Sequence, residues 1–184
     1  MKLDKLSWSD LVREAQEKQL PLAEFLLERS AAQAELEPAQ LLEEMAARLK
    51  VMEDAVAFGL TGVRSNSGLT GGSAKKMAAY ENAQKEQKSP GLLGPVAGSA
   101  VIYALAAAEA NGAMGRIVAA PTAGASGILP GILLALREHC QVEDAVLLEG
   151  LLVAGTIGEV IANRAMLSGA TGGCQAECGS GAAM

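Results

Sequence analysis

Apolar and charged positions alternate in the N-terminal third of the chain at the spacing of amphipathic helices. Apolar residues recur every three or four positions with charged residues between them, which gives a helix one apolar stripe. The pattern predicts helices over residues 11–18 and 21–35. Pro38 favours the start of a third, longer helix, and Gly59 and Gly62 end it. The apolar stripe of this third helix consists of Leu41, Leu42, Met45, Leu49, Met52 and Val56.

The rest of the chain predicts further helices, separated by stretches rich in glycine, serine and threonine. The predicted helices cover residues 74–88, 91–112, 128–140 and 142–165. The glycine-rich stretches are residues 65–76, 120–131 and 168–184. No strand-like alternation competes with the helical spacing. We therefore expect an all-α fold, a helical bundle whose glycine-rich loops converge on one site at one end.

The length of 184 residues predicts a single helical domain, residues 1–184. Residues 1–88 hold 26 of the 36 acidic and basic residues, whereas residues 89–184 hold 16 of the 21 glycines. Residues 1–56 are therefore expected to form a charged helical shell that braces the rest of the chain or contacts a partner. Residues 57–184 are expected to form a glycine-rich core that carries the candidate site.

Composition supports the helical prediction and narrows the range of partners. Half of the residues are hydrophobic but only 3% are aromatic, which favours closely packed helices over sheets. The formal charge is −6 and the pI is about 4.9, so there is no basic face to neutralise nucleic-acid phosphates. The N-terminus has no apolar signal region, and we expect a cytoplasmic protein.

One uncharged run, residues 91–108, has to be weighed as a membrane span. Its 18 residues meet the bare length criterion. However, it contains Pro95, Ser99 and several small residues, and Glu109 follows it directly. We therefore expect a helix buried in a soluble bundle, with no membrane partner.

The glycine-rich stretches also hold groups that could bind a small anionic molecule. Helix N-terminal amides, hydroxyls and ammonium groups bind such ligands. Ser73, Lys75 and Lys76 provide them in the first stretch, and Thr122 and Ser126 in the second. For at least one lysine we expect only a solvated helix start. No Walker loop is present and no G-x-G-x-x-G motif follows a predicted strand, so nucleotide binding is not expected.

The cysteines indicate a metal or reactive role. Their odd number and the absence of an export signal argue against a disulfide framework. Cys174 lies among small residues that suit an exposed thiolate on a tight turn, with a helix only beginning near Met184. Cys178 follows at helical spacing, although C-x-x-x-C alone is weak evidence for a metal. His139, near a helix C-terminus, is expected to be a surface residue, and Cys140 beside it is expected to be structural.

Three ordered motifs together resemble one family. They are TGGSAKK at residues 70–76, APTAGASGILPG at residues 120–131 and SGATGGCQAE at residues 168–177. In these motifs the chain resembles, from about Asp54 to Met184, the alpha chain of the iron–sulfur-dependent L-serine dehydratases. The resemblance makes residues 57–184 the catalytic core. It also implies a beta chain partner and an oligomer.

The resemblance implies that Cys174 ligates a [4Fe-4S] cluster, with two further cysteines beyond Met184 in the intact family. Cys178 is outside the usual ligand set, so a packing role is expected for it. Three thiolates leave one iron open as a Lewis acid for the serine hydroxyl. Removal of the 2-proton would then give aminoacrylate, and from it pyruvate and ammonia. The implied binding residues for L-serine are Ser73, Lys75, Thr122 and Ser126.

Two alternatives to this activity stay open. The composition of the glycine-rich loops does not show whether the substrate loses a hydroxyl or a thiol group. A cysteine desulfidase or another iron–sulfur lyase is therefore the alternative within the same chemistry. A non-catalytic helical or membrane-associated protein is the alternative of another class. The chain also looks like a truncated product, and we expect it alone to be inactive and to bind no stable cluster, because a cluster needs about three or four thiolates.

Overall fold

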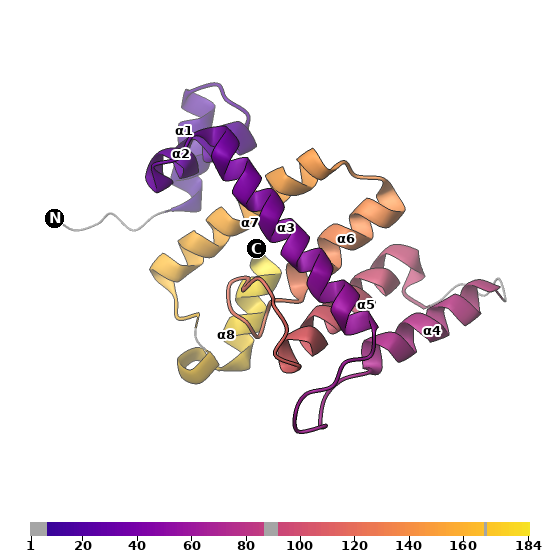
Figure 1. Cartoon of the computed structure of the whole chain (residues 1–184). Helices are drawn as coiled ribbons and strands as arrows, with labels where there is room; N and C mark the ends of the chain where they lie inside the picture. Colours follow the sequence, from indigo (N-terminus) through magenta and orange to yellow (C-terminus); the bar gives the residue numbers. More distant parts are fainter. Residues whose placement is uncertain (1–6, 87–91, 168) are drawn as a thin grey trace.

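The structure, a computed structural model, describes residues 7–86, 92–167 and 169–184. Within these ranges it contains eight helices and no strand, and Arg64 and Gly71 form one isolated β-bridge. The all-α prediction is confirmed (Figure 1). The helices are α1 (Trp8–Glu17), α2 (Leu22–Ala34), α3 (Pro38–Leu60), α4 (Ser73–Glu86), α5 (Gly94–Gly112), α6 (Ile128–Cys140), α7 (Asp144–Arg164) and α8 (Gly169–Ala183).

Helix α3 is the longest helix of the described part and crosses the molecule diagonally in Figure 1. Glu37 and Gln40 form a capping box at its N-terminus, with Pro38 in the first turn, and these features satisfy amides that a helix start leaves open. Its predicted stripe packs inward through Met45, Leu49, Met52 and Val56.

Helix α5 lies against α3, α4 and α6. The crossing with α3 is close because Gly59 has no side chain, and a Cβ at this position would overlap the backbone of Ala106. Ala106, Ala107 and Ala110 of α5 are buried as well. Small residues on both helices therefore let α5 sit in the middle of the helices that carry the glycine-rich loops.

The N-terminal helices share a core with the rest of the chain. Leu11, Phe25 and Met45 belong to the same buried cluster as Leu129 and Leu151. Charge therefore separates the two halves on the surface, while apolar packing joins them inside. The division into a shell, residues 1–56, and a catalytic core, residues 57–184, stays a prediction.

The most membrane-like helix is α7 and not the run that the sequence singled out. By length and composition α7 is the one helix of the described ranges that could span a membrane, and 39% of its most apolar window is buried. Leu147, Leu151 and Leu152 of α7 pack in the main core. Apolar residues of α7 therefore contribute to the core of the protein. The earlier candidate begins outside the described residues, and its remainder belongs to α5.

Two local predictions were wrong. The segment around Cys174 is not a loop before a late helix: α8 begins at Gly169 and is interrupted at Gly173, which has φ 77° and ψ 172°. Packing of Gly181 against Ile128 overrides the poor helix propensity of this glycine-rich segment. His139 is also not a surface residue, since its side chain is 16% exposed and bonds to Ser99 across the α5–α6 contact.

Candidate functional site

The backbone amides at the start of α4 are bound by a carboxylate of the chain itself. Glu109, buried in the last turns of α5, accepts hydrogen bonds from the amides of Gly72 at 3.0 Å, Ser73 at 2.7 Å and Ala74 at 3.3 Å. A carboxylate at a helix N-terminus satisfies open amides and the helix dipole together. The helix-end donors that the sequence offered to a substrate are therefore occupied within the chain.

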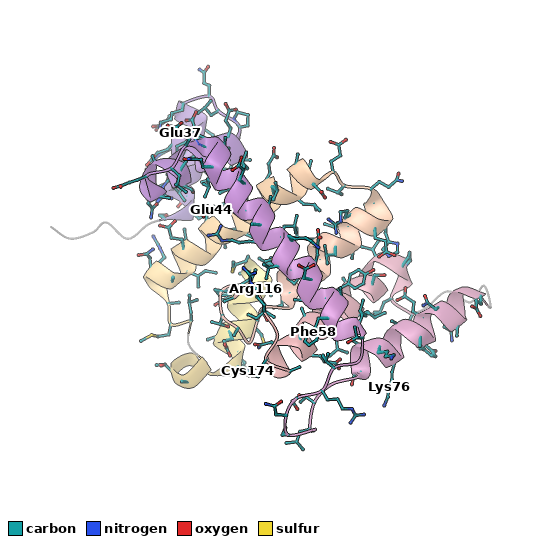
Figure 2. All side chains as sticks on the ribbon, viewed as in Figure 1. Glu37, Glu44, Phe58, Lys76, Arg116 and Cys174 are labelled. Atoms are coloured by element: carbon teal, nitrogen blue, oxygen red, sulfur yellow. The ribbon has the colours of Figure 1, made fainter. Side chains whose placement is uncertain are left out.

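The side chains predicted at the start of α4 point to solvent. Ser73 and Lys75 are exposed, and Lys75 donates to the backbone oxygen of Thr61 at 3.3 Å. Figure 2 labels Lys76 on this helix, well apart from Cys174 on α8. The structure thus places Ser73 and Lys75 in the first turn of α4 and not next to the cysteine.

The end of α5 holds both glycine-rich loops. Glu109 binds the start of α4, and Asn111, one half-turn later, donates its Nδ2 hydrogen to the oxygen of Ala123 at 3.0 Å. Ala123 lies in the loop between α5 and α6, residues 113–127, called the α5–α6 loop below. One helix end therefore fixes the position of the first loop relative to the second.

Two hydroxyls of the α5–α6 loop are buried without a hydrogen-bond partner among the described residues. They are Thr122 Oγ1 and Ser126 Oγ, and Ser126 is only 2% exposed. A buried polar group that stays unpaired costs about 1–3 kcal/mol, so native structures pair almost all of them with protein, water or ligand. Both predicted residues of this loop thus have unused hydrogen-bonding capacity.

Helix α8 covers the α5–α6 loop. A Cβ at Gly181 would lie 3.0 Å from the Cβ of Ala125 and 2.8 Å from Ile128. About one turn earlier, the Glu177 carboxylate lies so close to Gly124 that a Cβ there would meet it at 2.9 Å. Cys174 is one turn before Glu177 on the same helical segment. The predicted metal ligand is therefore on the helix that packs on Gly124 and Ala125, in the same loop as Thr122 and Ser126.

The two cysteines of α8 are in contact. Cys174 Sγ and Cys178 Sγ are 3.7 Å apart and both residues are exposed. The break at Gly173 makes Cys174 the first residue of the second helical segment. The pKa of the Cys178 thiol is raised, first by its hydrogen bond with Cys174 and then by the charge of that neighbour.

These thiols do not by themselves fit a [4Fe-4S] cluster. A cluster takes about three or four thiolates, but the described residues contain no group of three cysteine, histidine or acidic side chains that could hold a metal. Cys140 ends α6, whereas α8 touches the first residue of that 13-residue helix, about 18 Å away along the helix axis. The chain therefore supplies two neighbouring thiols, those of Cys174 and Cys178, while the third thiol, that of Cys140, is distant from them.

A second polar cluster lies between α5 and α6. Ser99 Oγ and His139 Nε2 are 2.8 Å apart, and Tyr103 donates to Glu138. Burial, followed by the hydrogen bond to Glu138, raises the pKa of Tyr103 to about 12. Sequence reasoning missed this cluster and the role of Glu109. The available signal for Glu109 was its position in the sequence, as a lone acidic residue directly after a long uncharged run.

Taken together, the described residues form a helical protein in which the end of α5 joins two glycine-rich loops and a pair of thiols lies on α8, the helix that packs against the second loop. The family model for "Serine dehydratase alpha chain" matches residues 17–184. The chain belongs to the serine dehydratase alpha chain family. No solved structure matches it.

Relatives with assigned names agree with this membership. The "Probable L-serine dehydratase, alpha chain" of Bacillus subtilis (strain 168) is 41% identical over 175 residues, which are 95% of this chain and 57% of that protein. The "L-serine dehydratase, alpha chain" of Peptoniphilus asaccharolyticus is 42% identical over 113 residues, 61% of this chain and 37% of that protein. The "L-serine dehydratase" of Streptomyces coelicolor is 33% identical over 95% of this chain and 38% of that protein. The chain thus spans less than two thirds of the length of each.

Proposed function

We propose that this chain forms the substrate-binding part of an L-serine dehydratase, which converts L-serine to pyruvate and ammonia. The observation that carries the proposal is the pair of buried hydroxyls of Thr122 and Ser126, which have no partner among the described residues and lie in the loop on which the helix of Cys174 packs. Family membership supplies the reaction class, and these hydroxyls supply a place for a small polar substrate.

The α5–α6 loop would orient the substrate through its hydroxyls. Serine has a carboxylate, an ammonium group and a hydroxyl, and the hydroxyls of Thr122 and Ser126 can each donate one hydrogen bond and accept others. Hydrogen bonds to a charged group are worth about 1.5–3 kcal/mol each. Ser73 and Lys75 stay candidate binding residues, although their exposure makes them weaker ones than the buried pair.

Cys174 would contribute one thiolate to the iron–sulfur cluster of the assembled enzyme. Because the described residues hold only two neighbouring thiols, the other ligands would have to come from residues outside this sequence. The proposal therefore assigns no step of the reaction to this chain alone. It includes a beta chain partner, an oligomeric state and a cytoplasmic location.

The experiment compares cysteine variants in the complete alpha chain, assembled with its beta chain and reconstituted with iron and sulfide under anaerobic conditions. Cys174→Ala should lose iron content and serine turnover together. Cys140→Ala, at the distant end of α6, is the matched control and should retain both. If Cys174→Ala keeps its iron and its turnover, the proposed ligand is wrong. If the reconstituted parent enzyme itself does not convert serine to pyruvate, the proposed function is wrong.

A further inference from the structure

We infer that Cys174 and Cys178 form a reversible redox pair that closes to a disulfide by exchange with low-molecular-weight disulfides. The two sulfur atoms are 3.7 Å apart on one face of α8, and both residues are exposed. A small disulfide can therefore reach either thiol, and the mixed disulfide that forms has a second thiol next to it.

The geometry of α8 allows the sulfur atoms to approach to bonding distance. A disulfide needs an S–S distance of about 2.05 Å and Cβ atoms about 3.5–4.5 Å apart, whereas helical neighbours four residues apart have Cβ atoms about 5–6 Å apart. The helix therefore has to yield slightly between the two cysteines. Gly173 precedes the pair and Gly179 follows it, and a Cβ at either glycine would meet no atom within 4 Å.

The local backbone favours this adjustment. At Gly173 the helix is already interrupted, so no regular turn has to be broken before Cys174. The glycines on both sides have open space around them, and glycine accepts backbone conformations that other residues do not. The pair is exposed and directly follows the break in the helix, whereas a buried i, i+4 pair inside a regular helix would resist closure.

The electrons and protons of this thiol–disulfide exchange balance without a metal. One cysteine thiolate attacks the small disulfide, forms a mixed disulfide and releases one small thiol. The second cysteine thiolate then attacks the cysteine sulfur of the mixed disulfide, which forms the Cys174–Cys178 bond and releases the second small thiol. The two cysteines lose two electrons and two protons, and the small disulfide gains them.

Closure would also control the ligand assigned to Cys174, a consequence that rests on the proposed function. Metal ligation needs a thiolate, and a sulfur in a disulfide cannot provide one. Cys178 would then be the residue that withdraws Cys174 from iron under oxidising conditions and returns it after reduction.

The test titrates the reduced chain with mixtures of reduced and oxidised glutathione and follows free thiols and intact mass. Because Cys140 is exposed as well, thiols and mass are counted, here and below, in a Cys140→Ser background. In this background the chain should lose two thiols, and its mass should fall by two hydrogens. A proteolytic fragment should contain the Cys174–Cys178 link, and dithiothreitol should restore both thiols. The chain that retains Cys140 should close the same bond.

The variant Cys178→Ser separates closure from simple modification. It should stop at one glutathione adduct on Cys174, because no neighbouring thiol resolves it. The inference is overturned if the unmodified chain also stops at glutathione adducts, or if its disulfide joins Cys140 or a second chain.

A second arm tests the consequence in the complete alpha chain. The reduced chain should take up iron and sulfide, the oxidised chain should not, and dithiothreitol should restore uptake. If the oxidised chain with a mapped Cys174–Cys178 bond takes up as much iron as the reduced chain, the proposed control of ligation is wrong. If the reduced chain itself takes up no iron while the disulfide still forms, the proposed function fails and the redox pair stands.

Discussion

The start of α4 and the α5–α6 loop look alike in sequence but differ in the structure. Both are rich in glycine and hydroxyl residues and both lead into a helix. At the start of α4 the free amides are bound by the buried Glu109 carboxylate. In the α5–α6 loop the hydroxyls of Thr122 and Ser126 are buried without a partner among the described residues. The amides at the start of α4 therefore bind a carboxylate of the chain itself, whereas the hydroxyls of the α5–α6 loop can still form hydrogen bonds to a ligand.

The difference shows that a glycine-rich sequence before a helix predicts hydrogen-bond donors. It does not predict whether these donors are free to bind a ligand. Glu109 lies among buried alanines of α5, where an unpaired carboxylate would be costly. The three amides at the start of α4 remove this cost. One buried acidic residue, distant in sequence, therefore occupies the backbone amides at the start of α4, while the side chains of Ser73 and Lys75 stay candidate binding groups.

The largest expected effect on this comparison is that of Glu109→Ala. It leaves the amides of Gly72, Ser73 and Ala74 without their acceptor, and we expect the free energy of unfolding to fall by about 2–4 kcal/mol. Glu109→Gln keeps one acceptor oxygen and should lose less. Urea denaturation measures both.

The control for this prediction is Glu149→Ala on the exposed side of α7. Its free energy of unfolding should change by less than about 0.5 kcal/mol. If Glu109→Ala is as mild as this control, Glu109 does not hold the two loops together as described.

The next effect is on substrate binding by the α5–α6 loop. In the complete enzyme, Thr122→Val and Ser126→Ala should raise the KM for serine about 10- to 100-fold while kcat and iron content are kept. Ser73→Ala should raise KM less, because an exposed hydroxyl already exchanges hydrogen bonds with water. Steady-state kinetics and iron analysis give the result.

Stability separates a binding role from a structural one in the same variants. A hydroxyl that has no partner in the free chain contributes no hydrogen bond to folding, so Thr122→Val should leave the free energy of unfolding unchanged or raise it slightly. A clear loss of stability, or an unchanged KM in both variants, would contradict the assignment of these hydroxyls to the substrate.

The smallest expected effect is that of Lys75→Met. The ammonium group of Lys75 is exposed and makes one hydrogen bond to Thr61, and such surface interactions are worth about 0–1 kcal/mol. We expect the midpoint of urea denaturation to move little. A large increase in the KM for serine, with the stability unchanged, would instead return Lys75 to the substrate site and reduce the contrast between the two regions.

Most of the fold could be predicted because its helices carry their own signals. Pro38 and the apolar stripe placed α3, and the turn residues around residues 128–140 placed α6 with the observed bounds. Helix α8 could not be predicted this way, since its glycines oppose a helix locally. It is helical where Gly181 packs on Ile128 and Ala125, contacts that bridge about 50 residues of sequence.

The residue types of the candidate site could be predicted from the sequence, but the hydrogen-bond partners of these residues could not. The sequence marked Thr122, Ser126 and Cys174 as polar or reactive residues among glycines. It showed Glu109 only as a lone acidic residue after an uncharged run, and it did not indicate that Glu109 binds the start of α4 or that His139 turns inward to Ser99. Such partners are chosen by how helices pack, and single-sequence patterns carry little information about that.

The sequence by itself determined the helical class, the boundaries of most helices and the motifs that place the chain in its family, because these depend on local propensity and spacing. Tertiary structure alone decided which donors stay free. The packing of α5 brought Glu109 to the α4 amides, and the packing of α8 placed the helix that carries the cysteine pair against the α5–α6 loop. Hydrogen bonds of buried groups depend on neighbours distant in sequence, and only the folded chain brings these neighbours together.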